Sequence, residues 1–194
     1  MPARRRETEA PASVYQLKVT LAGIRPPIWR RIQVPADITF GRLHDILQIV
    51  LGWEEEHLHE FEVKGVEYGP PEPEEMRGAP PVRNEHRARL NTLAPTEGST
   101  FSYRYDFGDD WRHAIRVEKI LPPEPGAQYP RCLTGKRSGP PEDCGGIWGY
   151  AELIETLQNP EREDYEEMRE WVGDDFDPEA FSVETINAAL RQLR

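Results

Sequence analysis

The chain has 194 residues, of which 37% are hydrophobic and 30% charged, and it carries 19 prolines. This length suits one well-buried core and is short for two. The formal net charge of −11 disfavours DNA as a partner, because DNA-binding proteins usually present a basic face to the phosphates. No stretch approaches the ~20 apolar residues that span a bilayer, so we expect no contact with a membrane.

The N-terminal residues and the cysteines indicate where the protein is located. Residues 1–12 are basic at the start, with no apolar segment behind them, which predicts a flexible tail rather than a secretion signal. A single domain is expected over residues 13–194. Cys132 and Cys144 are too few for a disulfide framework. We therefore expect a cytoplasmic protein with reduced thiols.

The N-terminal part of the chain predicts two strands, a helix and a third strand. Apolar residues alternate over 14–21, the period of a half-buried strand, and a second strand is predicted over 28–34. Apolar residues then recur at helical spacing between Thr39, a suitable N-cap, and Gly52, a suitable stop. Residues 57–63 predict the third strand.

The middle of the chain predicts a loop followed by a hairpin. Residues 70–98 are rich in proline and glutamate, which is typical of an extended acidic loop. Aromatic residues alternate from 101 to 107, Gly108 provides a turn, and residues 111–120 predict the returning strand.

The last fifty residues predict three helices. One covers 150–157, a second begins at Asn159 with Pro160 in the first turn, and a third begins at Ser182. The resulting order is β-β-α-β-β-β-α-α-α. It predicts an α+β fold in which a mixed or antiparallel sheet carries the N-terminal helix, followed by a helical C-terminal segment.

The histidines are the first candidate site. Two-residue periodicity places His57 and His59 on one face of the third strand, and His113 shares a face with apolar residues of the hairpin. Paired imidazoles on one face are a spacing that zinc sites use, with Cys132 and Cys144 as weaker candidate ligands. Histidines that form hydrogen bonds within a protein core would give the same pattern. A zinc cofactor and a structural role therefore both stay open.

Carboxylates form the second candidate site. Asp106, Asp109 and Asp110 crowd around the hairpin glycine near His113, and Glu142 and Asp143 follow in a later loop. Such groups can act as general acids and bases or hold a cation. Were the chain an enzyme, its candidate catalytic residues would be Asp106, Asp109, His113, Glu142 and Asp143. Asp and Gly also favour a hairpin turn for backbone reasons alone.

Two further segments could bind ligands. Gly145, Gly146 and Gly149 allow close backbone approach just before a helix, where an anion could bind. Residues 161–179 hold ten acidic residues against two arginines, a local charge of −8. This acidic segment suits either a solvated helix face or a docking surface for a protein with a basic surface.

Several motifs resemble one family, the plasmid pRiA4b ORF-3-like proteins, which also occur as passenger genes of insertion elements. The motifs run in order through the chain: Arg25-Pro-Pro-Ile-Trp-Arg30, His57-Leu-His-Glu-Phe61, Tyr103-Arg-Tyr-Asp-Phe-Gly-Asp109 and Pro140-Pro-Glu-Asp-Cys-Gly-Gly146. The resemblance implies an α+β fold and a plasmid or mobile-element setting, but no established activity. Many members of the family have a cysteine where this chain has Gly139, so the resemblance implies one ligand fewer for a cysteine-based metal site.

Three functions follow as hypotheses. The first is a binding or interaction module, because no complete catalytic motif is present. The second is a metal-dependent hydrolase with His57, His59 and His113 as ligands, which requires the three imidazoles to converge. The third is an accessory protein that handles nucleic acid, suggested by the mobile-element setting alone.

Overall fold

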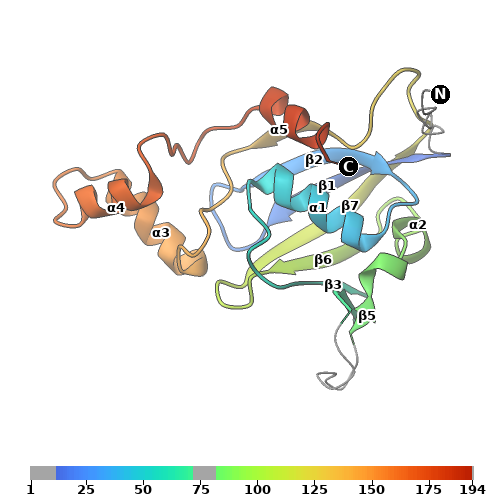
Figure 1. Ribbon diagram of the computed structural model, residues 1–194, viewed down its shortest axis with the longest axis horizontal. Coiled ribbons are helices and arrows are strands. Elements are labelled where there is room, and N and C mark those ends of the chain that lie inside the picture. Colours follow the sequence, from blue (N-terminus) through green and yellow to red (C-terminus); the bar gives the residue numbers. More distant parts are fainter. Residues whose placement is uncertain (1–11, 72–81, 194) are drawn as a thin grey trace, which may run out of the picture.

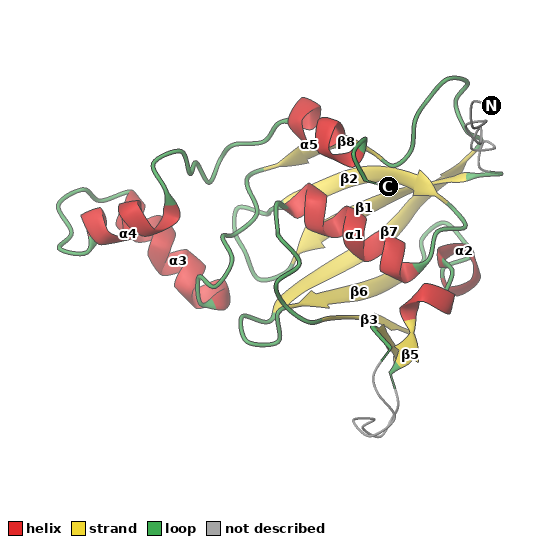
Figure 2. Cartoon of the chain, in the orientation of Figure 1, coloured by secondary structure: helices red, strands yellow, loops and turns green. Residues whose placement is uncertain are grey.

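The computed structural model describes residues 12–71 and 82–193. Within these residues eight strands form one sheet in the order β5-β4-β3-β6-β7-β1-β2-β8. Every pairing is antiparallel except that of β4 with β5, which is parallel. The helix of residues 40–51 lies against one face of this sheet (Figure 2). The predicted α+β fold is confirmed.

The elements follow in chain order. They are β1 (Val14–Leu21), β2 (Trp29–Pro35), α1 (Phe40–Leu51), β3 (His59–Val63), β4 (Val66–Gly69), β5 (Arg83–Asn84), the 3₁₀-helix η2 (Glu85–Arg87), α2 (Leu90–Leu93), β6 (Thr100–Tyr105), β7 (Trp111–Leu121), β8 (Arg131–Lys136), α3 (Gly146–Leu157), α4 (Tyr165–Val172) and α5 (Val183–Leu190).

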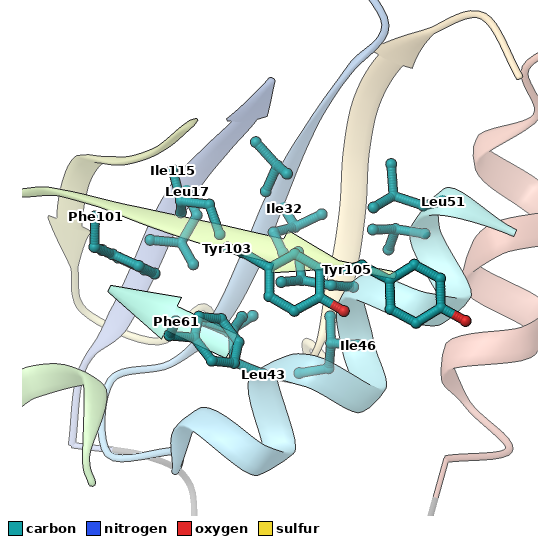
Figure 3. Packing of buried hydrophobic residues seen from close by; sticks show 14 of the residues in the cluster. Leu17, Ile32, Leu43, Ile46, Leu51, Phe61, Phe101, Tyr103, Tyr105 and Ile115 are labelled. Atoms are coloured by element: carbon teal, nitrogen blue, oxygen red, sulfur yellow. The ribbon is translucent and has the colours of Figure 1, made fainter. Parts of the chain in front are cut away.

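Helix α1 crosses in front of the sheet and forms the core with it (Figure 1). Its predicted ends are confirmed: the Thr39 hydroxyl accepts from the backbone N–H of Arg42, and Gly52 adopts a left-handed φ of 85° that lets its N–H reach the carbonyl of Gln48. Buried aromatic and aliphatic side chains from α1, β1, β2, β3, β6 and β7 fill the space between the two layers (Figure 3).

The opposite face of the sheet is open, and the strands alternate accordingly. In β7, Ile115 and Val117 are buried while Ala114 and Arg116 are exposed. Because period-two alternation is the signal of a half-buried strand, the strands beneath α1 are the ones that the sequence predicts well.

The sequence pattern misses three strands. β4 and β5 are too short, at four and two residues, to show a period. β8 lies at the edge of the sheet and buries one residue only, Cys132, so it shows no alternation. The predicted acidic loop 70–98 is accordingly shorter than expected, because residues 83–93 contain β5, η2 and α2. Part of that loop, 72–81, and nearly all of the predicted tail lie outside the described residues.

Three boundaries also differ from the prediction. The first C-terminal helix begins at Gly146 instead of residue 150. The third strand begins at His59 instead of His57. The second C-terminal helix begins at Tyr165, not after Asn159, whose side chain instead accepts from the N–H of Glu161 in a turn. The third C-terminal helix is confirmed, with the Ser182 hydroxyl accepting from the N–H of Thr185.

Helices α3 and α4 project beyond the edge of the sheet as an arm (Figure 1). No described residue of α4 is buried. Trp148, on α3, is 86% exposed, and Trp171, on α4, is 49% exposed. None of the helices in the described part of the chain has the length and apolar character to cross a bilayer.

Candidate functional site: a histidine–carboxylate cluster

His57 lies at the centre of a cluster of carboxylates. Its Nε2 atom is 3.1 Å from Oδ1 of Asp143, 3.7 Å from Oδ2 of Asp106 and 3.8 Å from Oε2 of Glu142. Glu56 also belongs here, since one of its carboxylate oxygens, a ring nitrogen of His57 and a carboxylate oxygen of Asp143 all lie within 4.8 Å of one another. Four carboxylates thus surround one imidazole, a strongly negative environment.

Glu142 reaches this cluster from the loop before α3. Its Oε1 atom accepts hydrogen bonds from the hydroxyl of Tyr105, at 3.0 Å, and from the backbone N–H of Glu54, at 3.1 Å. Its Oε2 atom is buried and accepts no hydrogen bond from the described residues. The carboxylate is therefore held by one oxygen while the other faces His57.

Asp106, in the β6–β7 turn, shows the same arrangement. Its Oδ1 atom accepts from the backbone N–H of Gly108 at 2.8 Å, which leaves Oδ2 directed toward His57. Its own N–H donates to the carbonyl of Leu58, which fixes the turn against the segment that carries His57. One oxygen fixed and one turned inward is how a protein orients a carboxylate that acts as a ligand.

The turns that carry Asp106 and Asp143 share an unusual backbone conformation. Asp106 and Asp143 each have a φ of 55°, in the left-handed region that costs energy for residues other than glycine. The N–H of Gly145 donates to Oδ2 of Asp109 at 3.1 Å, which connects the two turns. The left-handed aspartates therefore each bring a carboxylate within 4 Å of His57 Nε2, from segments almost forty residues apart.

The loop that carries Glu142 is also anchored to the aromatic core. The indole N–H of Trp53 donates to the carbonyl of Pro140 at 2.9 Å, and the Trp53 ring stacks on that of Tyr105 at 4.7 Å. Burial, followed by the hydrogen bond to Glu142, raises the pKa of Tyr105. The hydroxyl consequently stays protonated and donates to Glu142 at neutral pH.

The imidazole of His57 is the unusual member of the cluster. Its Nε2 atom is buried, yet it forms no hydrogen bond of acceptable geometry with any described residue, despite the nearby oxygens. Buried polar atoms in proteins are nearly always hydrogen-bonded. Two such atoms without a hydrogen bond, His57 Nε2 and Glu142 Oε2, therefore require an explanation.

The other histidines do not join this cluster. His59 points into the core, where its Nε2 atom donates to the buried carboxylate of Glu85 at 2.8 Å and its ring stacks on that of His44 at 3.4 Å. His113 is buried between Trp53 and Tyr103, and burial lowers its pKa to about 4. The expected His57–His59–His113 metal centre is therefore wrong, because His59 and His113 have partners of their own in the core while His57 lies among the carboxylates.

The cysteines are separate from the cluster as well. Among the described residues, Glu56, His57 and Asp143 form the only group of three or more His, Cys, Asp or Glu ligand atoms within 4.8 Å of one another. Cys132 is buried on β8, with its sulfur 3.8 Å from the carbonyl of Thr134. Burial raises the pKa of Cys144 to about 12, which disfavours the thiolate that binds metals.

The three glycines at the N-terminal end of α3 serve close packing within the chain. A Cβ atom on Gly149 would lie 1.8 Å from the carbonyl oxygen of Cys144, and one on Gly146 would lie 2.5 Å from that of Asp109. The N–H of Gly145 is already occupied by the carboxylate of Asp109. The anion site at Gly145, Gly146 and Gly149 stays a prediction.

Sequence reasoning therefore named four members of the cluster, His57, Asp106, Glu142 and Asp143, and combined them in the hydrolase hypothesis. That hypothesis also included His59, His113 and Asp109, which lie outside the cluster. It missed Glu56 and the orienting hydroxyl of Tyr105. Glu56 directly precedes His57 in a run of glutamates, and such runs usually indicate solvent-exposed surface. Tyr105 lies on an alternating aromatic face, which indicates core packing and conceals the polar contact.

Comparison with known proteins decides the family. The sequence pattern of the plasmid pRiA4b ORF-3-like proteins matches residues 13–185. The chain belongs to this family. It is 39% identical over 183 residues to the uncharacterized protein y4hQ of Sinorhizobium fredii, which covers 94% of this chain and 93% of the relative.

A solved structure supports the same relationship. The crystal structure of MM3350 from Methanosarcina mazei Go1, titled a protein of unknown function, matches with a TM-score of 0.80 and 44% identity. The match covers 89% of this chain and 96% of that one. MM3350 thus shares the fold of this chain, and the names of both relatives assign no activity.

Proposed function

We propose that this plasmid pRiA4b ORF-3-like protein is a binding module for a divalent metal ion, held by His57 with Glu56 and Asp143, whose ligand atoms lie within 4.8 Å of one another, and with Glu142 facing the same imidazole. The observation that carries the proposal is the pair of buried, unpaired atoms, Nε2 of His57 and Oε2 of Glu142. A metal ion between them would supply the missing partner for both. It would also neutralise carboxylates that otherwise repel one another.

The spacing supports this proposal. Zinc–nitrogen and zinc–oxygen bonds are ~2.0–2.2 Å long, so two ligand atoms of one metal lie about 3–3.5 Å apart. The distances from His57 Nε2 to the three oxygens, 3.1 to 3.8 Å, are close to that range. One imidazole with several carboxylates suits Zn²⁺, Mn²⁺ or Fe²⁺ better than Cu⁺, which prefers sulfur.

Isothermal titration of the purified, chelator-treated protein with ZnCl₂ and with MnCl₂ tests the proposal. We expect one site per chain, and a loss of affinity of more than about tenfold in His57→Ala and in Glu142→Gln. Glu142→Gln keeps the shape of the side chain and removes its charge. His86→Ala removes an exposed histidine outside the cluster and serves as the matched control. Wild-type protein that binds neither metal would refute the proposal.

A hydrolase built on this site is a second candidate. The side chain of Asp143 is 66% exposed, so the cluster opens to solvent on one side. A metal ion bound there would lower the pKa of a coordinated water and generate a nucleophile. Hydrolysis of p-nitrophenyl phosphate and p-nitrophenyl acetate by the zinc- and manganese-loaded protein tests this candidate. Rates equal to those of His57→Ala would dismiss it.

A protein-interaction role for the α3–α4 arm is the third candidate. The arm exposes Trp148 and Trp171 beside the acidic segment 161–179, and aromatic anchors beside charge are typical of docking sites. The partner would carry a basic surface. A partner that co-purifies stoichiometrically should be lost from Trp148→Ala and retained by Leu58→Ala, which changes an exposed residue away from the arm. Equal retention by both variants would exclude the arm.

A further inference from the structure

The open face of the sheet gathers positive charge in a protein whose net charge is −11. Lys18 on β1 lies directly opposite Arg31 on β2 and Arg116 on β7. Three cations therefore follow one another across three neighbouring strands. Lys119 on β7 faces Gln16 farther along the same strands.

This arrangement costs stability unless something neutralises it, because like charges directly opposite each other on adjacent strands repel. Glu118 forms two hydrogen bonds with Arg31, at 2.6 and 2.9 Å. Arg116 and Lys119 are both exposed, and in the described ranges no carboxylate lies within 4 Å of either one. The described part of the chain thus supplies no carboxylate partner for Arg116 or Lys119 on this face.

The same face is hollowed. A shallow depression of about 730 Å³ lies over the strands, lined by four cations against the single carboxylate of Glu118, a local charge of +3. Between the cations lie uncharged hydrogen-bonding side chains of Gln16, Thr20 and Thr100. The depression therefore combines positive charge with neutral donors and acceptors.

An aromatic ring lies beside the charges. Trp29, opposite Thr20 on the same face, is only half-buried. The Lys18 ammonium lies 5.4 Å from its ring centre and the Arg31 guanidinium 5.3 Å. Proteins that bind single-stranded nucleic acid combine these two features, cations that contact phosphates and an aromatic surface on which bases stack.

We propose that this face, formed by Lys18, Trp29, Arg31, Arg116 and Lys119, binds single-stranded nucleic acid. The cations contact the phosphates, and the indole and the neutral side chains contact the bases. An acidic protein would satisfy the charge but would make no use of the ring, which is why nucleic acid is the better occupant. The acidic remainder of the surface limits binding to this face.

Fluorescence anisotropy with fluorescein-labelled oligothymidylate and oligouridylate of about twenty nucleotides tests the proposal. Measurements in EDTA separate this face from the His57 cluster, where a metal ion could bridge to phosphate. We expect binding that weakens from about 50 to about 200 mM KCl with a logarithmic slope near −2, since about three phosphates are neutralised. A DNA duplex of equal length should bind more weakly.

Matched variants locate the binding. Arg116→Glu with Lys119→Glu should weaken binding at least tenfold and flatten the salt slope. Lys64→Glu with Arg191→Glu makes the same change in charge at exposed positions off this face and should preserve binding. Trp29→Ala should lose roughly tenfold, and Trp29→Phe should recover most of it. Circular dichroism confirms that each variant is folded.

Two results would overturn the inference. One is no anisotropy change for wild-type protein at low salt. The other is an equal loss of binding in both double variants, which would show a response to net charge alone. If light scattering instead finds a dimer that Arg116→Glu with Lys119→Glu dissociates, while no oligonucleotide binds, the face docks the acidic segment of a second copy and nucleic acid is excluded.

Discussion

His57 and His59 are two residues apart, and their surroundings are opposite. His59 lies in a closed network: its imidazole donates to Glu85, stacks on His44, and is 7% exposed. His57 lies at the edge of the fold, among carboxylates with which its buried Nε2 atom forms no proper hydrogen bond. The imidazole of His59 has a hydrogen-bond partner within the protein, and the Nε2 atom of His57 has none among the described residues.

The difference shows how to separate a structural polar group from a functional one. The network around His44, His59 and Glu85 joins α1, β3 and η2, and Tyr103 on β6 extends it by accepting from Gln48 and lying 2.8 Å from His44. Every link closes within the chain, which is the arrangement of a group that specifies the fold. The His57 cluster has atoms without a hydrogen-bond partner among the described residues, which is the arrangement that the proposed metal ion would complete.

The largest expected effect breaks the closed network. Glu85→Ala removes the acceptor of His59 and leaves a buried imidazole unpaired, so we expect the free energy of unfolding to fall by about 3–5 kcal/mol. Urea denaturation followed by far-UV circular dichroism measures it. Glu62→Ala, an exposed glutamate of β3, should change stability by less than about 0.5 kcal/mol. Similar losses in both variants would contradict a structural role specific to Glu85.

The next prediction compares how an added metal ion changes the stability of variants of His57 and His59. A ligand at a hundred times its dissociation constant stabilises the folded protein by about 2.7 kcal/mol. We expect ZnCl₂ at that excess to stabilise wild-type protein by this amount, to stabilise His59→Ala similarly from a lower baseline, and to leave His57→Ala unchanged. Without metal, His57→Ala should be close to neutral. A metal response that survives in His57→Ala would place the metal elsewhere.

A smaller effect appears with pH. Burial, reinforced by the neighbouring His59 and His86, lowers the pKa of His44 to about 3, from an ordinary value near 6.5. The unfolded chain therefore binds a proton that the folded one does not. Stability is complete above about pH 6.5 and falls with decreasing pH until about pH 3, by at most about 1.4 kcal/mol per pH unit.

Urea titrations in EDTA between about pH 6 and pH 5, where ordinary carboxylates stay ionised, measure this slope. His113, whose pKa burial lowers to about 4, contributes in the same direction. His44→Gln should have a shallower slope than wild-type protein, because one titrating group is gone. An identical slope in the two proteins would show that His44 is not neutral in the fold.

The sequence by itself determined the elements whose periodicity reports burial on one side. Strands β1, β6 and β7, helix α1 with its caps, and the start of α5 follow from alternation, helical spacing and capping residues. These signals are local, because each depends on residues a few positions apart. The strands β4, β5 and β8 lack such signals, since they are short or lie at the edge.

Only the tertiary structure decided which chemical groups meet. Residues 57, 106, 142 and 143 were each named from the sequence, but their convergence depends on two left-handed aspartates and on the bond from Gly145 to Asp109. His59 forms its hydrogen bond with Glu85, which lies in a segment that the composition predicted to be a loop. Such contacts join positions far apart in the sequence, and no local pattern encodes them. The packing of the sheet against α1 and its loops decides them instead.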